Sequence, residues 1–151
     1  MADHRAYLDA EMAAARAAPL ARRKALLVAM LIDAYVDRLF AGGGMGEDIL
    51  AFRAGVAQSS APLGRILALC AAGDKTRLAI ESVTVPLADY GRLSVEDFMV
   101  SLYNDHSVQR LLLVSADGTR HDMLDTLEGA IAALDGIHGA PPAHRKGPAG
   151  P

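Results

Sequence analysis

Two pairs of neighbouring aspartate and histidine residues are the first candidates for chemistry in this chain of 151 residues. Asp105-His106 lies between a predicted helix and a predicted strand, and His121-Asp122 lies on a predicted return strand. A carboxylate beside an imidazole can fix the ring tautomer for general-base catalysis, but adjacent strand residues point to opposite faces. No nucleophile motif such as Gly-x-Ser-x-Gly accompanies either pair. We therefore expect Asp105 to end one helix and Asp122 to cap the next, and we assign no catalytic residue.

A small-molecule pocket is the alternative use of the same residues. Tyr103, Asp105, His106 and His121 all fall near predicted junctions between helices and strands, where pockets tend to form. This alternative describes a small-molecule-binding protein or a small enzyme, with its pocket between a helical half and a sheet.

Carboxylates and glycines elsewhere in the chain lack the residues that a metal or phosphate site requires. Asp33 and Asp37 are four residues apart on one predicted helix, where two like charges need compensation. The chain has no His-Glu-x-x-His or helical Glu-x-x-His pattern, so we expect either a pairing with arginine or simple exposure of the two carboxylates, and no metal. The arginines that could compensate the pair are Arg38, Arg53 and Arg65. The glycine-rich run 42–46 follows a helix and lacks the Lys-Ser/Thr of a P-loop, which predicts a helix connection and no cofactor.

Cys70 is the single cysteine, which excludes an intrachain disulfide and every multi-cysteine metal cluster. It lies among Ile66, Leu67 and Leu69, and free cysteines in apolar surroundings are usually inert and buried. A chain without a disulfide framework is typical of a reducing compartment, so we expect a cytoplasmic location.

The charge balance argues against a nucleic-acid partner. The cluster Arg22-Arg23-Lys24 and the basic C-terminal residues favour one, but 15 Lys and Arg against 18 Asp and Glu give a net charge of −3. Aromatic residues make up 5% of the chain, tryptophan is missing, and no recognition motif is present. The apolar run 25–32 is also shorter than the roughly 18 residues of a membrane-spanning helix. We expect neither nucleic acid nor membrane as a partner.

The pattern of apolar residues divides the chain into a helical part and a part with strands. Residues 1–72 hold 20 alanines and residues 73–135 only 6. Apolar periodicity and capping residues predict four helices in the first part, over 1–18, 20–40, 48–58 and 61–72. Asp48 or Glu47 is expected to start the third helix, and Ser60 or Ala61 marks the start of the fourth, with Pro62 in its first turn.

The second part predicts the order β-α-β-β-α. Strands are expected over 78–87, 107–115 and 119–123, and a last helix over 124–135. Another helix is expected after the N-cap Ser94, with an apolar stripe of Val95, Phe98, Met99, Leu102 and Tyr103. Asp117-Gly118 predicts a hairpin that places His121 opposite Val114 and Met123 opposite Leu112. The apolar residues of the first strand occupy even positions before 81–82 and odd positions after it, which indicates either a bulge or burial on both faces. The pattern leaves the direction of this strand open.

These elements predict an α+β fold: an N-terminal helical bundle half of about four helices, then a small three-stranded sheet with two helices. We expect one domain over 1–135 and a disordered tail over 136–151, where half of the residues are Gly or Pro.

The predicted helix 20–40 carries more apolar surface than a small sheet and short helices can cover. Leu27, Leu31, Tyr35 and Leu39 lie on its main apolar face, and excess apolar surface on a soluble chain usually marks an interface. The motifs identify no known family. Our leading hypothesis is a non-catalytic protein that acts through protein–protein contacts, as an accessory, adaptor or regulatory subunit, and that self-associates.

Overall fold

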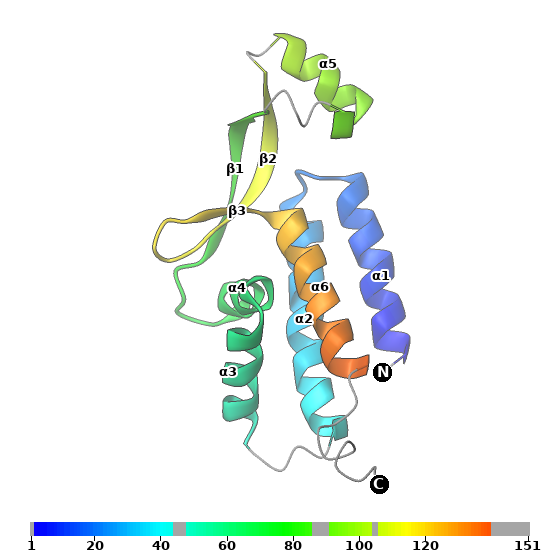
Figure 1. The fold of residues 1–151 in the computed structure, drawn as a ribbon, viewed down its shortest axis with the longest axis vertical. Helices are drawn as coiled ribbons and strands as arrows, with labels where there is room; N and C mark the ends of the chain where they lie inside the picture. The colour runs from blue at the N-terminus through cyan, green and yellow to red at the C-terminus, as the bar shows by residue number, and fades with distance from the viewer. Residues whose placement is uncertain (1, 44–47, 86–90, 104–105, 140–151) are drawn as a thin grey trace, which may run out of the picture.

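The computed structural model describes residues 2–43, 48–85, 91–103 and 106–139, and it confirms the predicted α+β order (Figure 1). Four helices come first, followed by a strand, a helix, two strands and a last helix. The elements are α1 (Ala2–Ala17), α2 (Arg22–Gly43), α3 (Ile49–Ser59), α4 (Ala61–Cys70), β1 (Arg77–Thr84), α5 (Val95–Tyr103), β2 (Ser107–Val114), β3 (Arg120–Asp122) and α6 (Met123–Gly139).

Helix α2 is the centre of the helical body, which consists of α1, α2, α3, α4 and α6. It contacts each of the other four helices. Its fully buried side chains include Val28, Ile32 and Val36, which no solvent reaches. The apolar face predicted for this helix is buried only in part, because Tyr35 and Leu39 lie in the core whereas Leu27 is 41% exposed. Apolar residues occur all round α2, so the neighbouring helices, rather than the pattern itself, decide which side is buried.

Capping side chains begin the later helices where the sequence predicts. The Asp48 carboxylate accepts the Ala51 N–H at 3.0 Å, and the Ser60 hydroxyl accepts the Leu63 N–H at 3.3 Å. The other two caps are Ser94, which accepts the Asp97 N–H at 3.1 Å, and Asp122, which accepts the Asp125 N–H at 3.0 Å. Each cap satisfies a donor that the first helical turn leaves unpaired.

The sheet is antiparallel with the order β1-β2-β3. The β1–β2 ladder is unbroken from Arg77↔Val114 to Thr84↔Ser107, so there is no bulge at 81–82. The switch from even to odd apolar positions instead reflects burial of residues on both faces of the strand. Leu78 packs against the core on one face, and Ala79 is 9% exposed on the other.

The β2–β3 hairpin differs by one residue from the predicted register. The Ser115 N–H donates to the Thr119 carbonyl at 2.9 Å, and Gly118, at φ +89°, closes a three-residue turn. Such a turn needs a left-handed residue at its third position, where we had expected a two-residue turn at 117–118. His121 therefore pairs with Leu113 rather than Val114, and Met123 starts α6 instead of facing Leu112.

The outer half of the β1–β2 ribbon projects from the helical body and carries α5 (Figure 1). β3 pairs only with residues 112–114, so in the described chain residues 107–111 of β2 pair only with β1. We call residues 80–84, α5 and residues 107–111 the arm. Helix α6 continues past the predicted end at Asp135 to Gly139, and the rest of the predicted tail, 140–151, lies outside the described residues.

Two exposed glycines should respond in opposite directions to replacement by alanine. A Cβ at either Gly118 or Gly55 meets nothing within 4 Å, so only the backbone decides the effect. Gly118→Ala forces a side chain into the left-handed region and should lower the free energy of unfolding by about 1–2 kcal/mol. Gly55→Ala, inside α3, should raise it by about 0.5–1 kcal/mol. Urea denaturation measures both, and a stabilising Gly118→Ala would contradict the turn geometry.

Candidate functional site

The residues predicted to line a pocket do not come together. His106 precedes β2 at the arm end, with φ 62°, and its N–H donates to the Ser101 carbonyl at 2.9 Å. His121 is half-buried on β3 and pairs with Leu113 at the other end of β2. At the rise of a strand, these two histidines lie on the order of 20 Å apart. Asp105 and the side chain of Tyr103 lie outside the described residues.

The aspartate pair of α2 is held by an arginine, as the sequence predicts. Arg53 of α3 donates from Nη1 to Asp37 at 2.8 Å and from Nη2 to Asp33. One guanidinium thus neutralises two carboxylates that would otherwise repel each other. The described ranges contain no group of three or more His, Cys, Asp or Glu arranged to hold a metal.

The surroundings of Cys70 favour the protonated thiol at neutral pH. The thiol is half-buried near the end of α4, and its pKa is raised to about 11. Burial is the largest cause, the negative charge of Asp33 also raises the pKa, and the positive charge of Arg53 lowers it. Only the thiolate attacks electrophiles, so the protonated thiol of Cys70 is a packing group.

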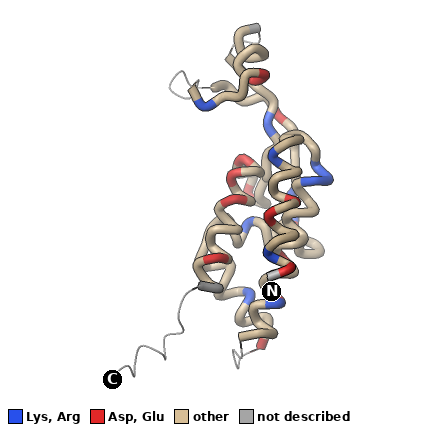
Figure 2. Tube along the Cα trace, turned by 90° about the vertical axis from the view of Figure 1, so that its right-hand side faces the viewer, with Lys and Arg blue, Asp and Glu red and all other residues tan. Residues whose placement is uncertain are grey.

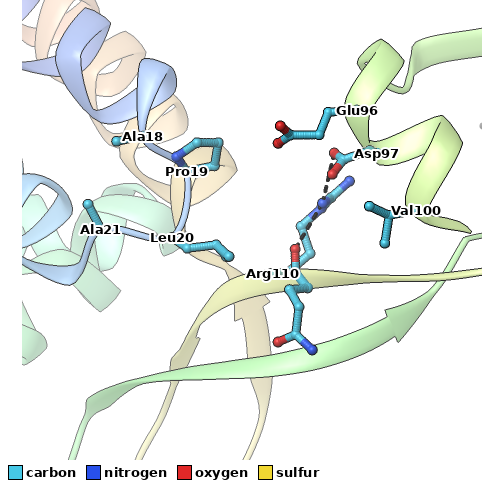
Figure 3. Close-up of a pocket in the computed structure, with 9 residues that line it drawn as sticks. Ala18, Pro19, Leu20, Ala21, Glu96, Asp97, Val100 and Arg110 are labelled. Carbon is cyan, nitrogen blue, oxygen red and sulfur yellow. Dashed lines mark hydrogen bonds and ion pairs between the residues drawn. The ribbon is translucent and has the colours of Figure 1, made fainter. Parts of the chain in front are cut away.

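A cleft of about 350 Å³ separates α5 from the turn between α1 and α2 (Figure 3). Leu20 and Pro19 line one side, and Glu96 and Asp97 of α5 face them across the opening. Arg110 of β2 is the only cation among the described lining residues, and its Nη1 is paired with Asp97 at 3.1 Å. The cleft therefore offers a neutralised guanidinium and an additional carboxylate, and neither His106 nor His121 is among its described lining residues.

Helix α5 has the largest concentration of exposed apolar side chains in the described chain. Five large apolar residues are at least 39% exposed on this helix of nine residues. They are Val95 (82%), Phe98 (40%), Met99 (49%), Val100 (39%) and Leu102 (51%). Figure 2 shows long uncharged stretches over this end of the molecule, while the charged residues gather on the helical body. The sequence predicts the apolar stripe of this helix, but its exposure depends on the tertiary position of the arm.

The four interface candidates on α2 divide between surface and core. Leu27 is 41% exposed and Leu31 is half-buried, while Tyr35 and Leu39 lie in the core at 2% and 7%. Tyr35 is covered by the ring of His4, whose centroid is 5.2 Å away in an edge-on arrangement. Tyr35 and Leu39 are therefore not available to a partner, because α1 and the bundle already cover them.

His4 and the ion pair of Arg5 with Asp135 were missed by the sequence reasoning. His4 Nε2 lies 2.8 Å from the Leu31 carbonyl oxygen, and Arg5 bonds Asp135 of α6 through two atoms, at 2.8 and 2.9 Å. The spacing of His4 with Leu8, Met12 and Ala15 follows one helix face, which could have placed the histidine in the core. Nothing local links residue 5 with residue 135.

Comparison with protein-family models, with curated proteins and with solved structures finds no match for this chain. None of the described helices combines the length and the apolar character needed to cross a lipid bilayer.

Cys70 should react slowly with iodoacetamide in the folded protein. A pKa of about 11 instead of 9.0 lowers the thiolate fraction at neutral pH about 100-fold, and alkylation should accelerate as the pH approaches 11. The measurement is the labelling rate in buffer against that in denaturant. The control is Ala72→Cys in a Cys70→Ala background, because residue 72 is exposed and should label at the denatured rate. Equal rates for both cysteines in the folded state would contradict the assignment.

Removing the guanidinium between α2 and α3 should destabilise the helical body. Arg53→Met leaves Asp33 and Asp37 uncompensated, and we expect the free energy of unfolding to fall by about 1–3 kcal/mol. Arg38→Met, at an exposed position of α2, is the matched control and should change it by less than about 0.5 kcal/mol. Chemical denaturation measures both. An equal loss in the two variants would show that the pairing contributes nothing.

Proposed function

We propose that this chain is a non-catalytic interaction protein, an accessory, adaptor or regulatory subunit, and that its contact surface is the arm. The observation that carries the proposal is the group of five large apolar side chains on α5, which are 39–82% exposed. The proposal thus puts the contact on the arm instead of on the α2 face that the sequence suggested.

The physical argument is the free energy of the uncovered apolar surface. Each square ångström of apolar surface removed from water contributes about 25 cal/mol, so covering half-exposed Met99 and Leu102 contributes on the order of 1 kcal/mol each. Within the described chain α5 is held by its contacts to β2, by the Asp97–Arg110 ion pair and by the hydrogen bond of His106 to Ser101. Such a short helix on a two-stranded ribbon is marginal in water, and a partner would stabilise it.

The composition of the arm also fits an interface. Aromatic residues and methionine are enriched at the centres of interfaces, and Phe98 and Met99 lie side by side on α5. Glu96, Asp97 and Arg92 supply charges near the start of the same helix, as a polar rim would. The candidate reactive groups outside the arm are poorly suited to catalysis, because the Cys70 thiol is protonated and Arg53 neutralises Asp33 and Asp37.

A small-molecule site in the cleft beside α5 is the second candidate. Its volume of about 350 Å³ falls within the range of ligand pockets, which is the observation in its favour. Against it, the guanidinium of Arg110 already pairs with Asp97, so an anionic ligand would have to displace a carboxylate.

Native mass spectrometry on protein purified gently from its own host separates the two candidates. The interaction proposal expects species heavier than the 15.8 kDa chain that contain further protein chains and no added small mass. A 15.8 kDa monomer with a reproducible small extra mass would instead favour the cleft.

Substitution of an apolar arm residue by glutamate should dissociate the assembly. Met99→Glu places an unpaired carboxylate in the proposed contact, and we expect at least a tenfold weaker association. The matched control is Met30→Glu, because Met30 is 56% and Met99 is 49% exposed and both lie on helices. Sedimentation measures the association, and circular dichroism verifies the fold. If Met30→Glu dissociates the assembly and Met99→Glu does not, the contact lies on α2 and the proposal is wrong.

A further inference from the structure

β1 is an edge strand whose outer side has no partner among the described residues. The sheet order is β1-β2-β3, and β2 is the only element with which β1 makes an extended contact. The Val85 N–H donates to the His106 carbonyl at 2.6 Å, which continues the unbroken ladder by one pair. Because the bonding direction alternates along an antiparallel strand, odd-numbered residues bond β2. Residues 78, 80, 82 and 84 therefore direct their N–H and C=O groups to the outer edge.

This edge carries few of the devices that keep sheet edges apart. Natural edges carry charged side chains, lysine especially, or proline or a bulge, or they are very short, and the charged residues of β1 are Arg77 and Glu81. β1 spans eight residues, contains no proline or lysine, and pairs without a bulge. Ile80 and Val83 are 37% and 36% exposed in the same strand. Such an edge accepts another strand through main-chain hydrogen bonds.

We infer that β1 pairs antiparallel with β1 of a second copy of this chain, about a two-fold axis at Ile80, to form a continuous six-stranded sheet. The inference rests on the proposed function and names the partner of the arm. A two-fold axis presents the same surface twice, and a strand paired antiparallel with itself satisfies that symmetry.

Charge selects this register. An axis at Glu81 would pair four outward residues of each strand, but it would place two glutamates opposite each other, which is unfavourable. An axis at Ile80 pairs Leu78 with Ser82 of the second copy, so that three outward residues of each strand form main-chain bonds and the glutamates are kept apart. The same register sets Arg77 diagonal to Glu81 of the second copy, a separation that long side chains span. Glu81 already accepts from Arg120 of its own chain at 2.8 Å, so two guanidinium groups would share this carboxylate. Ile80 then covers the exposed side chain of its own counterpart.

The pairing also accounts for the position of α5. The Asp97–Arg110 ion pair fixes α5 on the sheet face that bears Arg110. A two-fold axis perpendicular to the sheet keeps each face on its own side, so both α5 helices would lie on one face of the six-stranded sheet. The edge pairing thereby joins the two exposed apolar helices into one surface.

The first test removes one outward donor and nothing else from the ladder. Ser82→Pro deletes the N–H that points away from β2, and proline is tolerated at such edge positions. Ser82→Ala is the matched control, since both variants lose the bond from Gln109 Nε2 to the Ser82 hydroxyl at 3.0 Å. Sedimentation equilibrium should find dimers for the wild type and Ser82→Ala, and at least tenfold weaker dimerisation for Ser82→Pro with unchanged circular dichroism.

A second test fixes the register. In a Cys70→Ala background, Ile80→Cys should form a disulfide-linked dimer under mild oxidation, because the two positions face each other across the axis. Val83→Cys is equally exposed in the free chain but lies three residues from the axis, so it should cross-link at least tenfold more slowly. Equal or faster linkage of Val83→Cys would overturn the register.

The outcomes separate this inference from the proposed function. A wild type that is monomeric at every concentration overturns the self-pairing, and so does Ser82→Pro that dimerises as tightly as Ser82→Ala. If Ser82→Pro leaves a dimer that Met99→Glu dissociates, the arm is still the contact surface and strand pairing is wrong. If the isolated wild type is a monomer that binds another protein, and Ser82→Pro abolishes that binding, then the edge pairs with a strand of the other protein. The inference of pairing with a second copy would then be wrong.

Discussion

The burial of α2 is the constraint on which the rest of the structure depends. This helix is apolar nearly all round, so it is stable in water only if several neighbours cover it. α1, α3, α4 and α6 do so, and the first and last of these come from opposite ends of the described chain. The packing is close enough that a Cβ at Gly129 of α6 would lie 2.9 Å from the Pro62 ring of α4. Because these helices already cover one another, only one end of the sheet packs against the helical body.

β2 connects the helical body with the arm. Leu113, and Leu111 at the base of the arm, belong to the core, and the first half of the same strand pairs only with β1 in the described chain and supports α5. One strand therefore has two environments, with a three-stranded sheet against helices at one end and a two-stranded ribbon in solvent at the other. The apolar face of α5 and the outward edge of β1 both lie at the solvated end, which is why the proposed contacts concentrate there.

Local chemistry made the order of elements and their starting points predictable, and tertiary packing decided what was missed. Asp48, Ser60, Ser94 and Asp122 cap helices through bonds within three residues, so the sequence alone suggests them. The hairpin register was wrong because Gly118 takes the third turn position, a choice that flanking strand pairing makes. The local sequence pattern also could not predict which side of α2 is buried or how far His106 lies from His121. For the site, the Arg53 partner of the aspartate pair was among the arginines suggested, whereas the exposure of α5 required the fold.

The two environments of β2 impose a gradient of local stability along the long axis of the molecule. Amide groups of the bundle can exchange with solvent only when the core opens, while those of the arm need only the loss of a few ribbon bonds and one ion pair. The arm can therefore open and reclose many times during the lifetime of the folded body. A protein that binds there must first reduce this freedom, which costs affinity but leaves the body undisturbed. The proposed association would thus be largely independent of the folding of the helical body, to which the arm is joined through the middle of β1 and β2.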